Sequence, residues 1–166
     1  IGDIGFRFVK VSAINSDIEI SAVKAVKNYY EEEYKGSFEC DDELLNKIWK
    51  IGAYTVQLNM NHYLWDGIKR DRLVWIGDMH PETSTIGAVY GKSECVGNSL
   101  DLIKSETPSD KWMNGYPSYT LWWIIIIHDI FMQFGDIKYL KEQEEYLKGI
   151  IDHIAAMIDS GFTTGD

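Results

Sequence analysis

Pro117-Ser-Tyr-Thr-Leu-Trp-Trp-Ile-Ile-Ile-Ile-His-Asp-Ile-Phe-Met-Gln-Phe-Gly135-Asp136 is the stretch that decides the fold class of this 166-residue chain. Proline suits the first turn of a helix and glycine commonly terminates one, so the pattern predicts a helix over residues 117–134. Asp136 then offers an N-cap for a second helix over 137–159, which Gly161 ends. The second half of the chain is therefore predicted to be helical.

The helical pattern extends back to residue 42. Asp41 and Asp42 offer an N-cap, and the apolar residues that follow fall at helical spacing, which predicts a helix over 42–60. Two more helices are expected at 80–91 and 93–105. The loops between them, 61–78 and 106–116, hold much of the polar chemistry. Loops held on a rigid scaffold are where functional sites usually lie.

The first 35 residues differ from the rest, because their pattern favours strands. In residues 6–11, apolar and polar side chains alternate as they do in a half-buried strand. Residues 18–23 and 25–30 show a similar strand-like pattern. Three short strands cannot close a fold by themselves. We therefore expect residues 1–35 to be the end of a β-sandwich or a linker region, and 36–166 to begin a helical domain.

The amino-acid composition limits the kinds of binding partner that are expected. Sixteen basic residues against twenty-six acidic ones give a net charge of −10, which disfavours nucleic acid. The most apolar run, 121–127, is well short of the ~20 residues that a membrane span needs. Aromatic residues make up 13% of the chain, and several lie beside acidic ones. This composition suits a carbohydrate site and equally suits an aromatic-rich core.

The densest chemistry lies between residues 63 and 82. Four carboxylates occur there among basic side chains and next to Trp65 and Trp75; they are Asp66, Asp71, Asp78 and Glu82. Glycoside hydrolysis needs a protonated carboxyl for the leaving oxygen and a second carboxylate for water or the sugar. Alternating Asp and Arg is also typical of a surface salt-bridge network, and spacing alone does not separate the two.

No metal or other cofactor is expected. His80-Pro-Glu82 lacks the His-Glu-x-x-His spacing of a zinc hydrolase. Cys40 and Cys95 are too few for a structural zinc site. The loop around Asp78 is also less dense in Asp and Gly than calcium loops are.

The stretch Asp66-Gly-Ile-Lys-Arg-Asp-Arg-Leu-Val-Trp-Ile-Gly-Asp78 resembles the active-site signature of bacterial α-L-rhamnosidases of glycoside hydrolase family 78. Residues 5–11 are similar to the end of that family's β-domain, 36–49 to the start of its catalytic domain, and 134–140 to a recurring helix junction. The resemblance implies a mainly α fold, a partial (α/α)6 barrel preceded by a few strands of a β-sandwich. It also implies a carbohydrate substrate and inverting hydrolysis of terminal α-L-rhamnosyl groups.

The resemblance also implies roles for single residues. Asp71 matches the general acid by position. Asp66 and Asp78 would bind rhamnose hydroxyls with help from Arg70, and Trp75 would pack against the sugar.

The sequence departs from the family at the acid itself. Many members read Arg-Asp-Glu-Arg where this chain reads Arg70-Asp71-Arg72, one residue shorter, and their acid is the Glu. Aspartate is one methylene shorter, so the backbone must approach more closely or the role must move. Glu82 is the reserve candidate for the acid.

The loop at 106–116 adds two candidates. Trp112 and Tyr116 are expected to line the pocket, although packing within the loop explains them equally well.

The chain starts without an initiator Met or a signal peptide, and both ends suggest a piece of something longer. The family's general base lies downstream, so the fragment alone is expected to be inactive and its uncovered helix faces to self-associate. Bacterial cytoplasm and periplasm both stay open as compartments. The rival hypotheses are another helical-barrel carbohydrate enzyme and a non-catalytic sugar-binding or structural module.

Overall fold

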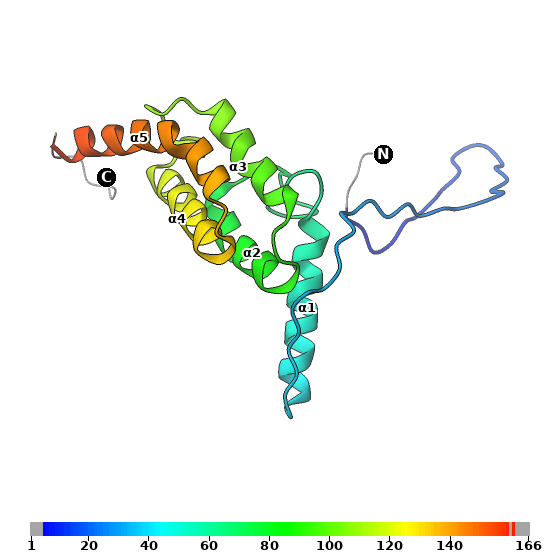
Figure 1. Ribbon diagram of the computed structural model, residues 1–166. Helices are drawn as coiled ribbons and strands as arrows, with labels where there is room; N and C mark the ends of the chain where they lie inside the picture. Colours follow the sequence, from blue (N-terminus) through cyan, green and yellow to red (C-terminus); the bar gives the residue numbers. More distant parts are fainter. Residues whose placement is uncertain (1–4, 160, 162–166) are drawn as a thin grey trace.

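Five α-helices and one 3-10 turn make up the folded body of the chain. The computed structural model describes residues 5–159 and 161. The elements are α1 (Glu43–Asn59), α2 (Ile76–Val89), α3 (Glu94–Glu106), η1 (Met113–Gly115), α4 (Pro117–Phe134) and α5 (Ile137–Asp159). α2 packs against α1, α3 and α4, and α4 also packs against α5 (Figure 1). Such packing of successive helices is consistent with part of a helical barrel.

Local end signals place the last two helices as predicted. Pro117 is the first residue of α4, and Gly135 ends it in the left-handed conformation with φ 66°. The side chain of Asp136 accepts a hydrogen bond from the backbone N–H of Tyr139 at 3.0 Å. At the start of α1, Asp42 accepts from the N–H groups of Leu44 and Leu45. These caps satisfy backbone groups that a helix end otherwise leaves unpaired.

The start of α2 was predicted wrongly. The helix was expected from residue 80, but α2 begins at Ile76 and carries Pro81 inside. Ile76 N–H donates to the side-chain oxygen of Asn114 at 3.1 Å. A partner 38 residues away in the chain therefore caps this helix, and no local signal marks it.

The three predicted strands do not form within the described residues. Residues 5–42 contain no strand, and side chains such as Phe8 and Val26 are 85% and 90% exposed. A strand needs a neighbour for a run of backbone groups, whereas in residues 6–30 one backbone hydrogen bond to the rest of the described chain is seen, from Tyr30 N–H to the carbonyl of Met60 at 3.2 Å. The end of the segment, however, is attached to the helices. Lys35 and Gly36 both donate their N–H groups to the carbonyl of Val89, at 2.7 and 2.9 Å.

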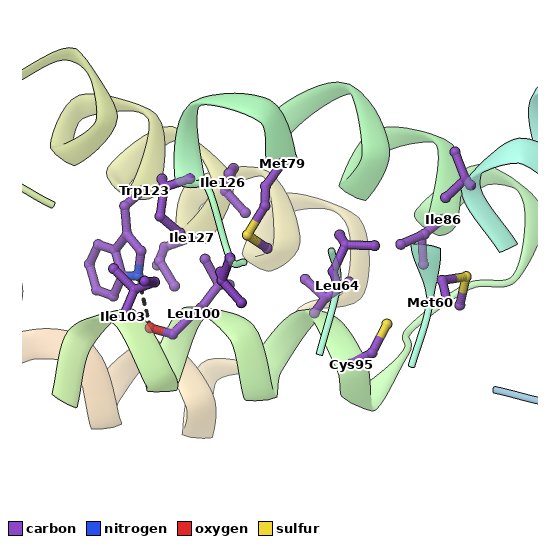
Figure 2. Close-up of a cluster of buried hydrophobic side chains, with 14 of the residues drawn as sticks. Met60, Leu64, Met79, Ile86, Cys95, Leu100, Ile103, Trp123, Ile126 and Ile127 are labelled. Atoms are coloured by element: carbon purple, nitrogen blue, oxygen red, sulfur yellow. Dashed lines mark hydrogen bonds between the residues drawn. The ribbon is translucent and has the colours of Figure 1, made fainter. Parts of the chain in front are cut away.

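The hydrophobic core lies between α2, α3 and α4. Trp123 on α4 is fully buried, and its indole N–H donates to the carbonyl of Leu100 on α3 at 3.2 Å (Figure 2). Met79 from α2 and Ile126 from α4 complete this part of the core. Burying the largest side chain while satisfying its one donor ties α4 to α3.

No described helix combines the length and the apolar character needed to cross a bilayer.

Replacing Trp123 by alanine should lower the free energy of unfolding by about 3–5 kcal/mol, because it leaves a large cavity in the core. Met132, on the same helix, is 67% exposed, and Met132→Ala should change stability by no more than about 0.5 kcal/mol. Denaturant unfolding followed by circular dichroism measures both. Equal effects of the two substitutions would contradict the packing described above.

Self-association of this chain stays a prediction, and the structure locates the surface for it. Several apolar side chains of α1 are about half exposed, among them Leu45, Ile48 and Ile51. We expect sedimentation velocity to show a mass that rises with protein concentration. Ile48→Glu should reduce that rise, whereas Lys47→Glu beside it should not. A monomer at all concentrations would refute the prediction.

Candidate active site

The loop between α1 and α2 is fixed at its start by the core. Met60 and Leu64 form an antiparallel bridge, and both side chains are buried. The N–H of Leu64 donates to the hydroxyl of Ser99 on α3 at 2.8 Å. Trp65 N–H then donates to the carbonyl of Asn59 at 3.1 Å. The residue that follows, Asp66, is thereby held at a defined place near the end of α1.

Asp66 closes the next part of the loop. Its N–H donates to the carbonyl of Leu73, and its carboxylate accepts the N–H of Leu73, both at 3.2 Å. The Asp66 side chain is fully buried, whereas that of Arg70 is 64% exposed. The two form an ion pair at 3.5 Å, which is too long for a good hydrogen bond. Asp71 lies in the loop that this pairing closes, and it is exposed.

Arg72, next to Asp71, has a left-handed backbone with φ 53°. A residue other than glycine rarely adopts this conformation, and such strain gathers at functional sites.

Asn114 joins the two loops that the sequence analysis singled out. Its side-chain oxygen accepts the N–H of Ile76, and its side-chain N–H donates to the carbonyl of Val74, both at 3.1 Å. Asn114 and Gly115 both have positive φ, at 51° and 83°. The sequence analysis missed Asn114, although an Asn-Gly pair is a signal for such a turn. The 106–116 loop thus holds the residues that lead into α2.

Glu82 lies one turn after Asp78 on α2 and faces α1. The side-chain N–H of Asn59 donates to Oε1 of Glu82 at 2.9 Å, and Oε2 is buried without a hydrogen-bond partner. Burial raises the pKa of Glu82 to about 7, with the charges of Asp78 and Asp66 adding to the rise and Asn59 opposing it. The structure therefore places the two predicted sugar-binding carboxylates close to Glu82. Asn59 was missed, since one asparagine near a helix end carries no signal.

Four buried polar atoms in this region have no hydrogen-bond partner among the described residues. Two are acceptors and two are donors: Asp66 Oδ2, Glu82 Oε2, Trp65 Nε1 and Trp75 Nε1. Burying a polar atom without a partner is costly, and most native proteins have few such atoms. A ligand with several hydroxyl groups can satisfy carboxylates and indoles together, because each hydroxyl both donates and accepts.

The predicted aromatic residues separate into two places. The ring of Trp75 contacts Tyr119 edge-on at 6.2 Å between centroids, and Tyr119 in turn lies 5.0 Å from Tyr116. Trp112 instead packs against His153 on α5 at 4.5 Å. Tyr116 therefore belongs to the same aromatic group as Trp75, whereas Trp112 contacts a different helix.

Tyr119, which links the group, was not singled out from the sequence. Gly77 makes its position possible, since a Cβ there would lie 2.2 Å from the Tyr119 ring.

Among the described residues, no group of three or more His, Cys, Asp or Glu side chains is placed to hold a metal ion.

Comparisons with known proteins identify the family of the helical part of the chain. A family profile described as the bacterial α-L-rhamnosidase six-hairpin glycosidase domain matches residues 33–165. A curated α-L-rhamnosidase of Formosa agariphila is 33% identical over 76 residues, which is 46% of this chain and 8% of that protein. The crystal structure of a GH78 family rhamnosidase of Bacillus sp. GL1 superposes with a TM-score of 0.70 and 27% identity, over 78% of this chain and 15% of that one.

The chain thus spans only a small part of either relative. The profile nevertheless covers residues 33–165 of a 166-residue chain, which is most of its length. The chain accordingly belongs to the family of bacterial α-L-rhamnosidase six-hairpin glycosidase domains.

Proposed function

We propose that this chain forms part of a glycoside hydrolase that releases terminal α-L-rhamnosyl groups with inversion. The observation that carries the proposal is the set of buried atoms without a hydrogen-bond partner on Glu82, Trp65 and Trp75, together with Asp66 Oδ2, which has only the 3.5 Å ion pair with Arg70. Sugar hydroxyls donate to carboxylates and accept from indole N–H groups, so side chains of these kinds suit a sugar-binding site. Membership of the family and the two rhamnosidases named above support rhamnose as that sugar.

Within this proposal the substrate is held from several sides. Asp66 and Asp78 accept hydrogen bonds from hydroxyl groups, and the exposed guanidinium of Arg70 donates to the sugar. Trp75 offers its ring to the apolar face of the sugar, and Tyr116 extends that surface. Trp112, packed on α5, would line the site only at its outer edge.

Asp71 is the proposed general acid. It is exposed in the loop that Asp66 closes, where a leaving-group oxygen can reach it. Glu82 remains the second candidate for the same role. A good general acid has a pKa near the working pH, and the pKa of Glu82 is about 7. Burial, with the nearby charges of Asp78 and Asp66 adding to its effect, favours the protonated form of Glu82.

Inversion also needs a general base. The two carboxyl groups of an inverting enzyme lie ~6.5–9.5 Å apart with water between them. We propose that the base comes from a part of the hydrolase outside this chain, so that the chain alone is inactive. We further propose that residues 1–35 end a β-sandwich or linker region and that 36–166 open the (α/α)6 barrel.

Substrates with different leaving groups can show whether Asp71 or Glu82 is the general acid. A p-nitrophenyl rhamnoside needs little protonation as it leaves, whereas an alkyl rhamnoside depends on the acid. We expect Asp71→Asn in the complete hydrolase to lower kcat/KM on the alkyl substrate by about 10²–10⁴-fold, and much less on the aryl one. Glu82→Gln should lower both to a similar extent. Steady-state kinetics on the two substrates measures this.

The opposite pattern, with Glu82→Gln selective for the alkyl substrate, would move the acid to Glu82. No turnover of either rhamnoside by the wild-type hydrolase, together with retained sugar binding, would favour a binding module instead.

Protonation of Glu82 should also make the free energy of unfolding depend on pH. A carboxyl whose folded pKa is raised stabilises the fold most below its unfolded value of 4.5, and this contribution is lost as the pH rises through about 7. Relative to Glu82→Gln, the wild-type chain should therefore lose up to about 3 kcal/mol of unfolding free energy between pH 4.5 and 8. Urea unfolding at several pH values measures the difference.

Glu145→Gln is the matched control, because Glu145 is exposed on α5. Its difference from the wild type should stay flat across the same pH range. A flat difference for Glu82→Gln as well would show that Glu82 ionises normally.

A further inference from the structure

A cavity lies at the other end of the helices from the candidate active site. It has a volume of about 440 Å³ and lies between α2, α3, α4 and the start of α5. Gly87 near the end of α2, Lys92 in the following turn, and Gln133 near the end of α4 all line it. The candidate active site is built on the loops that precede α2 and α4. The cavity is therefore at the opposite end of the same two helices.

Polar side chains on the cavity wall are held by partners. Asp101 accepts the hydroxyl of Tyr139 at 3.1 Å and the amide of Gln143 at 3.4 Å. Asp129 is bonded to His80 at 3.1 Å and to His128 at 2.9 Å, and these bonds lower its pKa. The two carboxylates therefore hold their positions without a ligand, as groups of a preformed site do.

The floor of the cavity is apolar. Ile86 and Ile126 are almost completely buried, and Val96 is 6% exposed. Phe134 and Tyr139 add aromatic surface to the wall. An apolar floor with a few fixed polar groups is typical of small-molecule sites, and a volume of this size falls within their usual range of about 300–1,000 Å³.

Gly97 leaves part of this space open. It lies in the middle of α3 and lines the cavity, although glycine weakens a helix interior by roughly 0.5–1 kcal/mol relative to alanine. A Cβ added to Gly97 would meet nothing within 4 Å, so packing in the described structure does not require glycine here. A residue that keeps space open at some expense of stability is consistent with close approach of a ligand.

We propose that this cavity binds a neutral, polyhydroxylated ligand of mono- to disaccharide size, separately from the candidate active site. Fixed carboxylates, amides and hydroxyls can hydrogen-bond its hydroxyl groups, and the isoleucines and rings cover its C–H faces. Anions are disfavoured, because Glu94, Asp101 and Asp129 face one lysine, Lys92, which is itself paired with Asp136. The site would hold a second sugar without taking part in hydrolysis.

Gly97→Leu tests the proposal, since Gly97 lines the cavity and a Cβ there meets nothing within 4 Å, so a larger side chain can take up cavity space. Gly52→Leu is the matched control, because Gly52 lies in a helix interior with nothing within 4 Å of its Cβ position and does not line the cavity. Saturation-transfer NMR with L-rhamnose, D-galactose, D-glucose and D-xylose measures binding to each variant. Binding at the candidate active site is common to all variants and cancels in the comparison.

At least one of the four sugars should bind at least about tenfold more weakly to Gly97→Leu and equally well to Gly52→Leu. Circular dichroism should show both variants folded. The proposal fails if no sugar distinguishes the two variants. It also fails if spermidine, and none of the sugars, shows the dependence on Gly97, because the cavity would then be a cation site.

Discussion

Burial of the seam between α2 and α4 is the constraint on which the rest of this structure depends. Trp123 fills the space beside α3 and gives its only donor to Leu100, so α4 cannot shift without losing both packing and a hydrogen bond. Because α2 packs along α4, the two helices start at the same end of the body. The loops before them, carrying Asp66 and Asn114, are therefore brought together by the core.

The sequence predicted well what is locally encoded and poorly what depends on distant residues. Helices 117–134 and 137–159 agree with the structure because Pro117, Gly135 and Asp136 act on their own neighbours. The start of α2 was missed because its cap is Asn114, far along the chain. The strands expected in 6–30 failed for the same kind of reason, since strand pairing is decided by a partner and not by alternation alone.

The candidate site shows a similar division. Its carboxylates and tryptophans were singled out from the sequence, most of them from one motif. The residues that surround them in the structure were not. That Glu82 would be buried beside Asp66 and Asp78, and held by Asn59, follows from how α1 packs on α2. In α2, Asp78 and Glu82 are four residues apart and therefore lie on one face of the helix, yet only the packing determines which of the carboxyls loses water.

The buried acids oppose the stability that the seam provides. Glu82 Oε2 is buried without a hydrogen-bond partner, Asp66 Oδ2 has only its 3.5 Å ion pair with Arg70, and the charges of Asp78 and Asp66 disfavour ionisation of Glu82. A fold selected for stability alone would pair these groups or replace them with apolar ones. The sugar proposed above would supply hydrogen-bond partners for these carboxyls and for the indole N–H groups of Trp65 and Trp75. The burial that raises the pKa of Glu82 is itself produced by the packing of α1 on α2, so the same packing that stabilises the fold sets the charge state of this carboxyl.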